Sequence, residues 1–260
     1  RRVARERRAH RLLSRVRQTR AVAAVFFDLD GTLLDGSALP GAVRGACELV
    51  AVRTGVDVDR LLDANTEAWQ ELWPEIEDEW MLGRIDDEAV GARSWTGTLA
   101  RCGIRDPSLV RAAVTTYREL ERRAHRLYPE VPGMLRAVRS AGHRIGLITN
   151  GASGMQRGKL AAVGLTAAFD PTVVSSEVGV KKPDPGIFEH ALVQAGAEPA
   201  DAWHVGDNPW VDVVGAAAAG LRTVWVNRTG AERPEDTPRA DLEVASLDGL
   251  ADLLAAQDPR

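Results

Sequence analysis

The chain of 260 residues has little cysteine and no long apolar segment. Its two cysteines, Cys47 and Cys102, lie in no CxxC pair and near no histidine cluster, which excludes a disulfide framework and a structural zinc site. The longest apolar runs, 21–27 and 213–221, fall far short of the ~18 residues that a membrane-spanning helix needs. We therefore expect a cytoplasmic protein that makes no membrane contact.

Basic charge is concentrated at the start of the chain. Residues 1–20 hold nine arginines and one acid, Glu6, although the whole chain has a net charge of -4. We expect residues 1–20 to form a basic, disordered arm outside the folded unit. Such an arm could bind nucleic acid, so a nucleic-acid-binding protein is the alternative from another functional class. Because the acidic remainder has no recognition motif or aromatic-basic platform, we do not expect nucleic acid as a partner.

Short apolar runs alternate with helical patterns over most of the chain. The run 21–27 contains two valines and two phenylalanines, which is typical of a central parallel strand covered on both faces. Further strands are predicted at 144–149, 172–175, 202–205 and 222–226, and helices at 133–141, 153–163, 186–195 and 209–219. This order predicts an α/β fold with a doubly wound parallel sheet, whose ligands bind beyond the carboxyl ends of the strands.

Residues 37–128 interrupt this alternation and are predicted to form an inserted all-helical domain of four helices. One helix is expected over 40–53, and another over 107–127 with Asp106 as its N-cap and Pro107 at its first position. The sheet domain then comprises 21–36 and 129–260. The insertion contains four of the seven tryptophans: Trp69, Trp73, Trp80 and Trp95. We expect each of them to pack in its core, although a tryptophan near the edge of the insertion could instead line a substrate cleft.

Two acids follow directly after the first predicted strand. Asp28 and Asp30 are separated by one residue, and like charges this close resist joint ionisation without a counter-ion. Mg2+ is the natural counter-ion because it prefers hard oxygen ligands and accepts one or two carboxylates. Gly31 permits a tight turn after the strand, and the Thr32 hydroxyl can bond to that turn or to a carboxylate.

Anion-binding groups follow the second core strand and precede a later helix. Thr149, Asn150 and Gly151 offer a hydroxyl, an amide and a backbone N–H beside a glycine, which together can bind an anion. Lys182 stands just before a predicted helix N-terminus, where a fixed ammonium could neutralise a phosphoryl group.

A second acidic pair follows the strand at 202–205. Asp207 stands at the end of this strand as a candidate metal ligand. Asp212 falls in the following helix, from which it could orient ligands or pair with a lysine. His204 precedes the pair, and its place within the strand indicates a structural role.

These segments resemble the motifs of the haloacid dehalogenase-like hydrolase superfamily. They occur in the family's order, as DLDGT from Asp28, Thr149-Asn150, Lys182 before Pro183, and GDxxxxD from Gly206 to Asp212. The resemblance covers residues 21–230 and implies a Rossmann-like core. The insertion looks like the helical cap of the branch that includes phosphoglycolate phosphatase, 5'-nucleotidases, beta-phosphoglucomutase and the 2-haloacid dehalogenases.

The resemblance implies a Mg2+-dependent phosphohydrolase that acts on a small phosphorylated metabolite. Asp28 would be the nucleophile that forms an aspartyl-phosphate, and Asp30 the general acid and base. Mg2+ would be bound by Asp28, the backbone carbonyl of Asp30 and Asp207, with Asp212 in support. The phosphoryl oxygens would be bound by Thr149, Asn150, Gly151 and Lys182.

Two other activities of the same superfamily stay open. A 2-haloacid dehalogenase lacks an acid two positions after its nucleophile, so Asp30 argues against that activity. A phosphomutase would keep all four motifs. The substrate is open as well, although Gly83 and Arg84 resemble a cap loop that reaches the active site in relatives, so that Arg84 could contact an anionic substrate.

Overall fold

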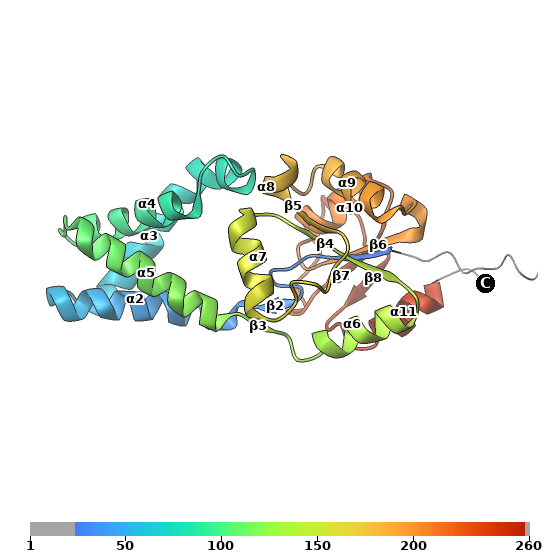
Figure 1. The fold of residues 1–260 in the computed structure, drawn as a ribbon, viewed down its shortest axis with the longest axis horizontal. Coiled ribbons are helices and arrows are strands. Elements are labelled where there is room, and N and C mark those ends of the chain that lie inside the picture. Colours follow the sequence, from blue (N-terminus) through green and yellow to red (C-terminus); the bar gives the residue numbers. More distant parts are fainter. Residues whose placement is uncertain (1–23, 258–260) are drawn as a thin grey trace, which may run out of the picture.

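The computed structural model describes residues 24–257, and the arm expected at 1–20 lies outside them. Figure 1 shows a sheet-based core beside a bundle of helices. The core contains one parallel sheet of six strands in the order β5-β4-β1-β6-β7-β8. The strands are β1 (Ala24–Phe27), β4 (Arg144–Thr149), β5 (Thr172–Val174), β6 (Ala202–Gly206), β7 (Arg222–Val226) and β8 (Leu242–Val244). The predicted doubly wound parallel sheet is confirmed.

Strand β1 is central and buried on both faces. Phe27 pairs with Leu147 of β4 on one side and with Val205 of β6 on the other. Because successive side chains of a strand point to opposite faces, Val25 and Phe27 enter one apolar cluster, whereas Ala24 and Phe26 enter another. This double burial explains why the run carries no polar residue before Asp28.

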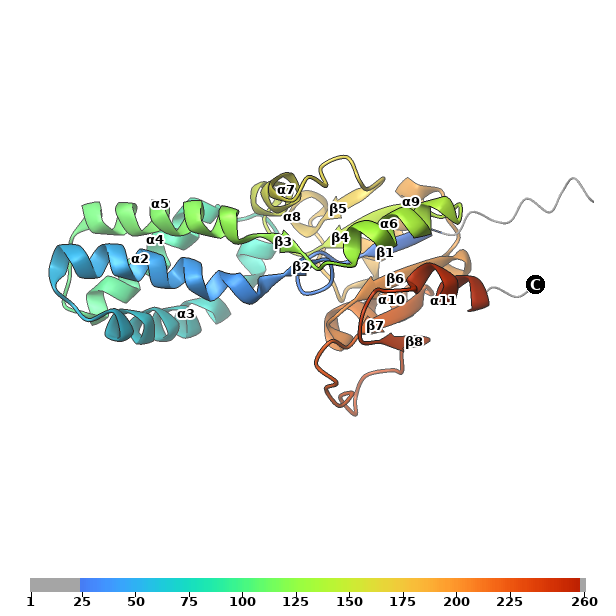
Figure 2. The ribbon, with the colours of Figure 1, turned by 90° about the horizontal axis from the view of Figure 1, so that it is seen from below.

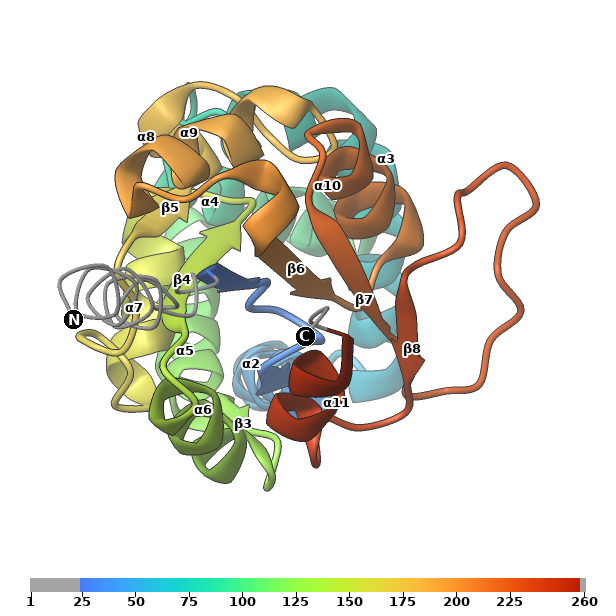
Figure 3. The same ribbon diagram turned by 90° about the vertical axis from the view of Figure 1, so that its right-hand side faces the viewer.

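Helices cover both faces of the sheet, as Figure 3 shows end-on. One face packs against α6 (Val131–Ser140), α7 (Ser153–Ala162) and α11 (Leu250–Gln257). The other packs against α9 (Pro185–Ala195) and α10 (Val214–Ala218). Short helical segments complete the core: α8 (Ser175–Val178), η2 (Pro199–Asp201) and η3 (Pro209–Val213).

Four helices form the unit that we call the helical insertion. They are α2 (Leu39–Thr54), α3 (Val58–Met81), α4 (Asp87–Arg101) and α5 (Pro107–Ala124). Aspartate side chains cap three of them, because Asp57, Asp86 and Asp106 accept hydrogen bonds from backbone N–H groups of the first turn. The insertion has its own apolar core, which includes both cysteines, and these are free.

A two-stranded ribbon joins the insertion to the core (Figure 2). Strand β2 (Leu34–Asp35) pairs antiparallel with β3 (Arg126–Leu127), and η1 (Gly36–Ala38) leads into α2. Arg126 Nε lies 2.9 Å from Oδ2 of Asp35 across the ribbon. The chain therefore enters and leaves the insertion at one place.

The structure differs from the sequence prediction at the ends of several helices and strands. The strand expected over 172–175 ends at Val174, and the helix expected over 209–219 begins as a π-helical turn before α10. Strand β8, helix α11 and the β2–β3 ribbon were not predicted. Within residues 24–257, no helix combines the length and apolar character that crossing a membrane requires.

Candidate active site

The first acidic loop begins where β1 ends. Asp28 is buried, and its backbone N–H donates to the carbonyl oxygen of Val205 at 2.9 Å. Gly31 turns the chain with a φ of +79°, and a Cβ at this position would lie 2.3 Å from Oδ2 of Asp207. Glycine is needed here because it allows both the left-handed turn and the close approach to the second acidic loop.

A buried lysine links the two acidic loops. Lys182 Nζ donates to Oδ1 of Asp28 and to Oδ1 of Asp212, in both cases over 2.6 Å. Burial alone would lower the pKa of Lys182, but the two acids outweigh burial and raise the pKa above its ordinary value. Lys182 is therefore a charged ammonium fixed at the carboxyl edge of the sheet.

Two further hydrogen bonds hold the Asp212 carboxylate in place. His204 Nε2–H donates to its Oδ1 over 2.9 Å, and the backbone N–H of Asn208 donates to Oδ2 over 3.1 Å. Burial opposes ionisation of Asp212, but Lys182 and His204 keep its pKa below the ordinary value. Burial lowers the pKa of His204 and favours its neutral form. The buried His204 thus has the structural environment that the sequence indicated.

Three carboxyl groups converge at this edge. Asp28, Asp207 and Asp212 offer oxygen atoms that all lie within 4.8 Å of one another. Burial and the nearby Asp212 raise the pKa of Asp207 to about 6. Burial raises the pKa of Asp28 to about 8, although Lys182 acts in the opposite direction. A divalent cation would relieve this crowding of acids, and the all-oxygen donor set fits Mg2+.

Asp207 is oriented by neighbouring groups. The Thr32 hydroxyl donates to its Oδ1 over 3.2 Å, and Trp225 Nε1–H donates to its backbone carbonyl over 2.9 Å. Thr32 therefore bonds to a carboxylate, which is one of the two partners expected for it.

The segment after β4 lies beside Lys182. Asn150 Oδ1 accepts from the backbone N–H of Lys182 over 2.8 Å, and its Nδ2–H donates to the Lys182 carbonyl over 2.9 Å. The Gly151 N–H donates to Oγ of Ser175 over 2.9 Å. The Asn150 amide therefore fixes the backbone that carries the Lys182 ammonium, a role that the sequence did not predict.

Helix α7 supplies two side chains that the sequence prediction missed. Lys159 Nζ donates to both carboxylate oxygens of Asp30 over 2.9 and 2.8 Å. Gln156 Nε2 donates to Asp30 over 3.0 Å and to the Thr149 hydroxyl over 2.5 Å. Burial alone would raise the pKa of Asp30, but Lys159 and Gln156 hold it below the ordinary value. The three-residue spacing of Gln156 and Lys159 places both side chains on one helix face, but it does not indicate what that face contacts.

The helical insertion reaches the core next to this site. The Ser175 hydroxyl, which accepts from Gly151, also bonds to the carbonyl of Met81 at the end of α3. Lys181 Nζ lies 2.6 Å from Oδ1 of Asp78 on the same helix. The Arg84 guanidinium is exposed and pairs with Glu79 over 3.2 Å, so the structure does not bring it together with the other predicted site residues.

A cavity of about 720 Å³ lies inside the helical insertion and is bounded by Met155 of α7. The four tryptophans of the insertion line it. Core packing, the default expectation, is wrong for Trp69, whose side chain is 39% exposed and lines this cavity instead. Trp73 and Trp80 of the same helix still pack against a buried cluster that includes Val90 of α4, to which Trp69 does not belong.

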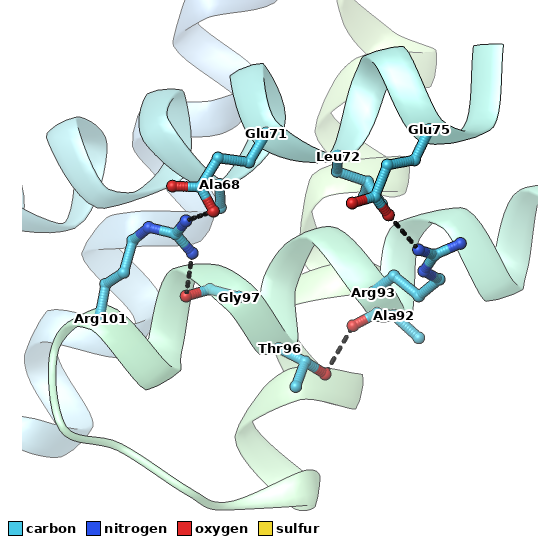
Figure 4. A pocket seen from close by; sticks show the side chains of 9 residues that line it. All are labelled: Ala68, Glu71, Leu72, Glu75, Ala92, Arg93, Thr96, Gly97 and Arg101. Carbon is cyan, nitrogen blue, oxygen red and sulfur yellow. Dashed lines mark hydrogen bonds and ion pairs between the residues drawn. The ribbon is translucent and has the colours of Figure 1, made fainter.

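A smaller hollow of about 420 Å³ lies between α3 and α4 (Figure 4). Its charged side chains already pair across the hollow, Arg93 with Glu75 over 3.0 Å and Arg101 with Glu71. No predicted site residue lines it. The hollow is therefore not a candidate for the reaction site.

Comparison with known sequences identifies related proteins. Residues 22–220 match the family model of the haloacid dehalogenase-like hydrolases. The chain is 46% identical over 128 residues to the phosphoserine phosphatase of Thermus thermophilus, a match that covers 49% of this chain and 51% of that protein. It is 32% identical over 228 residues to the glyceraldehyde 3-phosphate phosphatase of Methanopyrus kandleri, a match that covers 87% of this chain and 92% of that protein. The chain thus spans about half the length of the first relative and most of the second.

Solved structures share the fold over almost the whole chain. A 2-haloacid dehalogenase from Pseudomonas syringae pv. Tomato superimposes with a TM-score of 0.66 at 26% identity, covering 91% of this chain and 100% of the other. The putative HAD-hydrolase YfnB from Bacillus subtilis, bound to magnesium, gives a TM-score of 0.68 at 21% identity. The superposition covers 90% of this chain and 99% of the other. The second likeness concerns the fold alone.

Proposed function

We propose that the chain, which belongs to the haloacid dehalogenase-like hydrolase family, is a phosphatase that hydrolyses small phosphomonoesters. The phosphatase from Methanopyrus kandleri, which is similar over most of both chains, supports this activity. The observation that carries the proposal is the buried Asp28, which lies 2.6 Å from a fixed ammonium and beside two further acids. A nucleophile, a positive charge and a metal-binding acid set are what phosphoryl transfer requires.

Asp28 is the proposed nucleophile. One of its carboxylate oxygens attacks phosphorus and forms an aspartyl-phosphate, while the bond from phosphorus to the leaving oxygen breaks and its electron pair stays on that oxygen. Asp30 gives the leaving oxygen a proton. Water then attacks phosphorus, loses a proton to Asp30, and releases inorganic phosphate with the Asp28 carboxylate restored. Lys159 favours the carboxylate form of Asp30, which is the form that the second step uses.

The phosphoryl oxygens are proposed to lie between Lys182 and the segment after β4. Lys182 neutralises charge as it develops on these oxygens. Thr149 and Gly151 line the same edge, and Asn150 fixes the Lys182 backbone through its two hydrogen bonds. Rigid placement matters because phosphoryl transfer is catalysed mainly by positioning and charge neutralisation.

Mg2+ is the proposed cofactor. Asp28, Asp207 and the backbone carbonyl of Asp30 would hold it, while Asp212 supports the site from its bond to Lys182. When bound, the cation supplies positive charge to the phosphoryl oxygens and favours the ionised forms of the buried acids. Thr32 keeps the Asp207 carboxylate turned toward this position.

The helical insertion, residues 37–128, is proposed to act as a cap over the core formed by 21–36 and 129–260. Two contacts with the core near Gly151 support this division: Met81 bonds to Ser175, and Asp78 pairs with Lys181. The cap would bind the organic part of the substrate, whereas the core carries out the chemistry.

Phosphate release from a panel of phosphomonoesters, with Mg2+ and with chelator, tests the function. The wild type is expected to turn over with Mg2+ and to lose activity with chelator. The Asp28→Asn variant keeps the size of the side chain but removes the nucleophile, so it is expected to be folded and inactive. Turnover by a purified, metal-loaded Asp28→Asn variant would refute Asp28 as the nucleophile.

Dehalogenation is the second candidate, because a 2-haloacid dehalogenase shares the fold over 91% of this chain. Asp30 argues against it, since those enzymes lack this second acid. Halide release from 2-chloropropionate, measured with the same protein, separates the two activities. Transfer of the phosphoryl group to a sugar-phosphate acceptor instead of water would identify a phosphomutase.

A further inference from the structure

The cavity inside the helical insertion has an aromatic wall. About 720 Å³ is within the usual range of ligand pockets, and four of the chain's seven tryptophans line it. The Trp69 and Trp73 rings are stacked with centroids 5.5 Å apart, and Trp80 meets Trp73 edge-on at 5.7 Å. These rings form a continuous surface along one side of α3.

This wall is only partly covered by the protein. Trp69 is 39% exposed, and Trp73 and Trp80 are partly exposed as well. Other lining residues are also apolar, among them Val43, Leu62 and Val114. A partly exposed stack of large aromatic rings in a concave site is a surface that a flat apolar group would cover well.

The polar groups of the lining do not change the apolar, aromatic character of the cavity. Trp80 Nε1–H donates to Asp87 over 2.6 Å, and the Tyr117 hydroxyl donates to Glu121 over 3.0 Å, so both lining carboxylates already have a partner. Arg118 is the one cation among the residues of 24–257 that line the cavity. The described part of the chain therefore does not provide the cavity with the cluster of cations that a second phosphate would require.

The cavity borders the catalytic edge of the core through α7. Met155 lines the cavity, and the next residue, Gln156, donates to Asp30 and Thr149. The Asp87 carboxylate lies 3.9 Å from the position that a Cβ on Gly154 would occupy. A group attached by a short spacer to a phosphate beside Lys182 could therefore extend into the cavity.

From this placement we infer that the substrates carry a flat aromatic or heteroaromatic ring, joined to the phosphate by a short spacer, and that the ring lies against Trp73 and its neighbours. This inference rests on the phosphatase function proposed above. A short polar substrate such as a three-carbon sugar phosphate would leave the aromatic wall in contact with water. Burial of a phenyl-sized group predicts a preference of about 30-fold in kcat/KM over the same ester without the ring.

The test compares 3-phenylpropyl phosphate with propyl phosphate in the presence of Mg2+. Both release a primary alcohol of similar acidity, so the chemical step is matched and only the ring differs. We expect kcat/KM to be about 30-fold higher for the phenylpropyl ester. Trp73→Ala is expected to reduce this ratio about tenfold, since it removes the ring that stands between its two aromatic neighbours.

Two further variants separate ring binding from a general effect on the fold. Thr66→Trp places a large ring at an exposed lining position, so it should fill the cavity and reduce the ratio even if Trp73→Ala is unstable. Val52→Ala changes an apolar side chain on the same bundle that is 88% exposed and outside the cavity, and should leave the ratio unchanged.

The outcomes distinguish the two proposals. Equal kcat/KM for the two esters, or a Trp73→Ala variant and a Thr66→Trp variant that both keep the wild-type ratio, would overturn the ring inference while the phosphatase function stands. Absence of phosphate release from both esters and from 4-nitrophenyl phosphate would overturn the phosphatase function, and the ring inference with it.

Discussion

Two neighbouring lysines make a matched test of the electrostatics of the site. The Lys182 side chain is 2% exposed and contacts Asp28 and Asp212, whose side chains are 10% and 2% exposed. The Lys181 side chain is 27% exposed, and its partner Asp78 is 72% exposed. Lys→Met removes the charge in each case and keeps most of the apolar stem. The two variants therefore compare a buried ion-pair network with a surface pair.

The two variants are expected to lose different amounts of unfolding free energy, by a factor of several. Removal of one partner from a buried ion pair costs about 3–5 kcal/mol, because the remaining charge stays buried without compensation. Asp212 keeps its bonds from His204 and Asn208, so the lower end of that range applies, about 3 kcal/mol for Lys182→Met. Lys181→Met should cost at most about 1 kcal/mol, since exposed pairs contribute little.

Urea unfolding at neutral pH with chelator present measures both free energies. A Lys182→Met variant within ~1 kcal/mol of Lys181→Met would refute this account of the site. The double variant Asp28→Asn with Lys182→Met provides a second check. It should be less destabilised than the sum of the single variants, because the two groups interact directly. Strict additivity of the two changes would contradict the contact between them.

Three further results are expected. Gly31→Ala should lower activity at least about tenfold, because the new Cβ would meet the Asp207 carboxylate, whereas Gly230→Ala, with a similar φ of +67° and open space around it, should keep full activity. Mg2+ should raise the melting temperature of the wild type but hardly that of Asp207→Asn, which loses a proposed ligand; equal shifts would argue against a metal site there. The ion pair of Glu177 with Arg157 lowers the pKa of Glu177 from 4.5, so its stabilisation is present above that pH and is lost as the pH falls through the lower folded value. Unfolding free energies of the wild type and Arg157→Leu should accordingly converge in acid, and a gap that persists at low pH would contradict this.

The sheet and its acidic edge could be predicted because their signals are local. A strand buried on both faces must be apolar throughout, as β1 is, and the carboxyl ends of parallel strands meet at one edge. Those two rules predict from the sequence that Asp28 and Asp207 lie together. The structure brings them there, with Asp212 beside them.

The remaining features depend on tertiary packing that the sequence does not encode locally. Lys159 contacts Asp30 only because α7 lies against the end of β1, and no pattern within α7 determines that approach. Strand β8 is short and only partly buried, so it lacks a clear apolar run. The exposure of Trp69 depends on how the helices of the insertion pack together, which the helical periodicity of its residues leaves undetermined.

The ribbon at the base of the insertion has a consequence for how the chain folds. Strands β1 and β4 are neighbours in the sheet, with Phe27 opposite Leu147, yet the whole insertion lies between them in sequence. An unstructured connection of that length would slow their pairing through the entropy of loop closure. Because Leu34 pairs with Leu127, the folded insertion brings its two ends together and leaves the strands joined by a short effective loop. The insertion can therefore change in size or sequence without lengthening the path that the sheet must close.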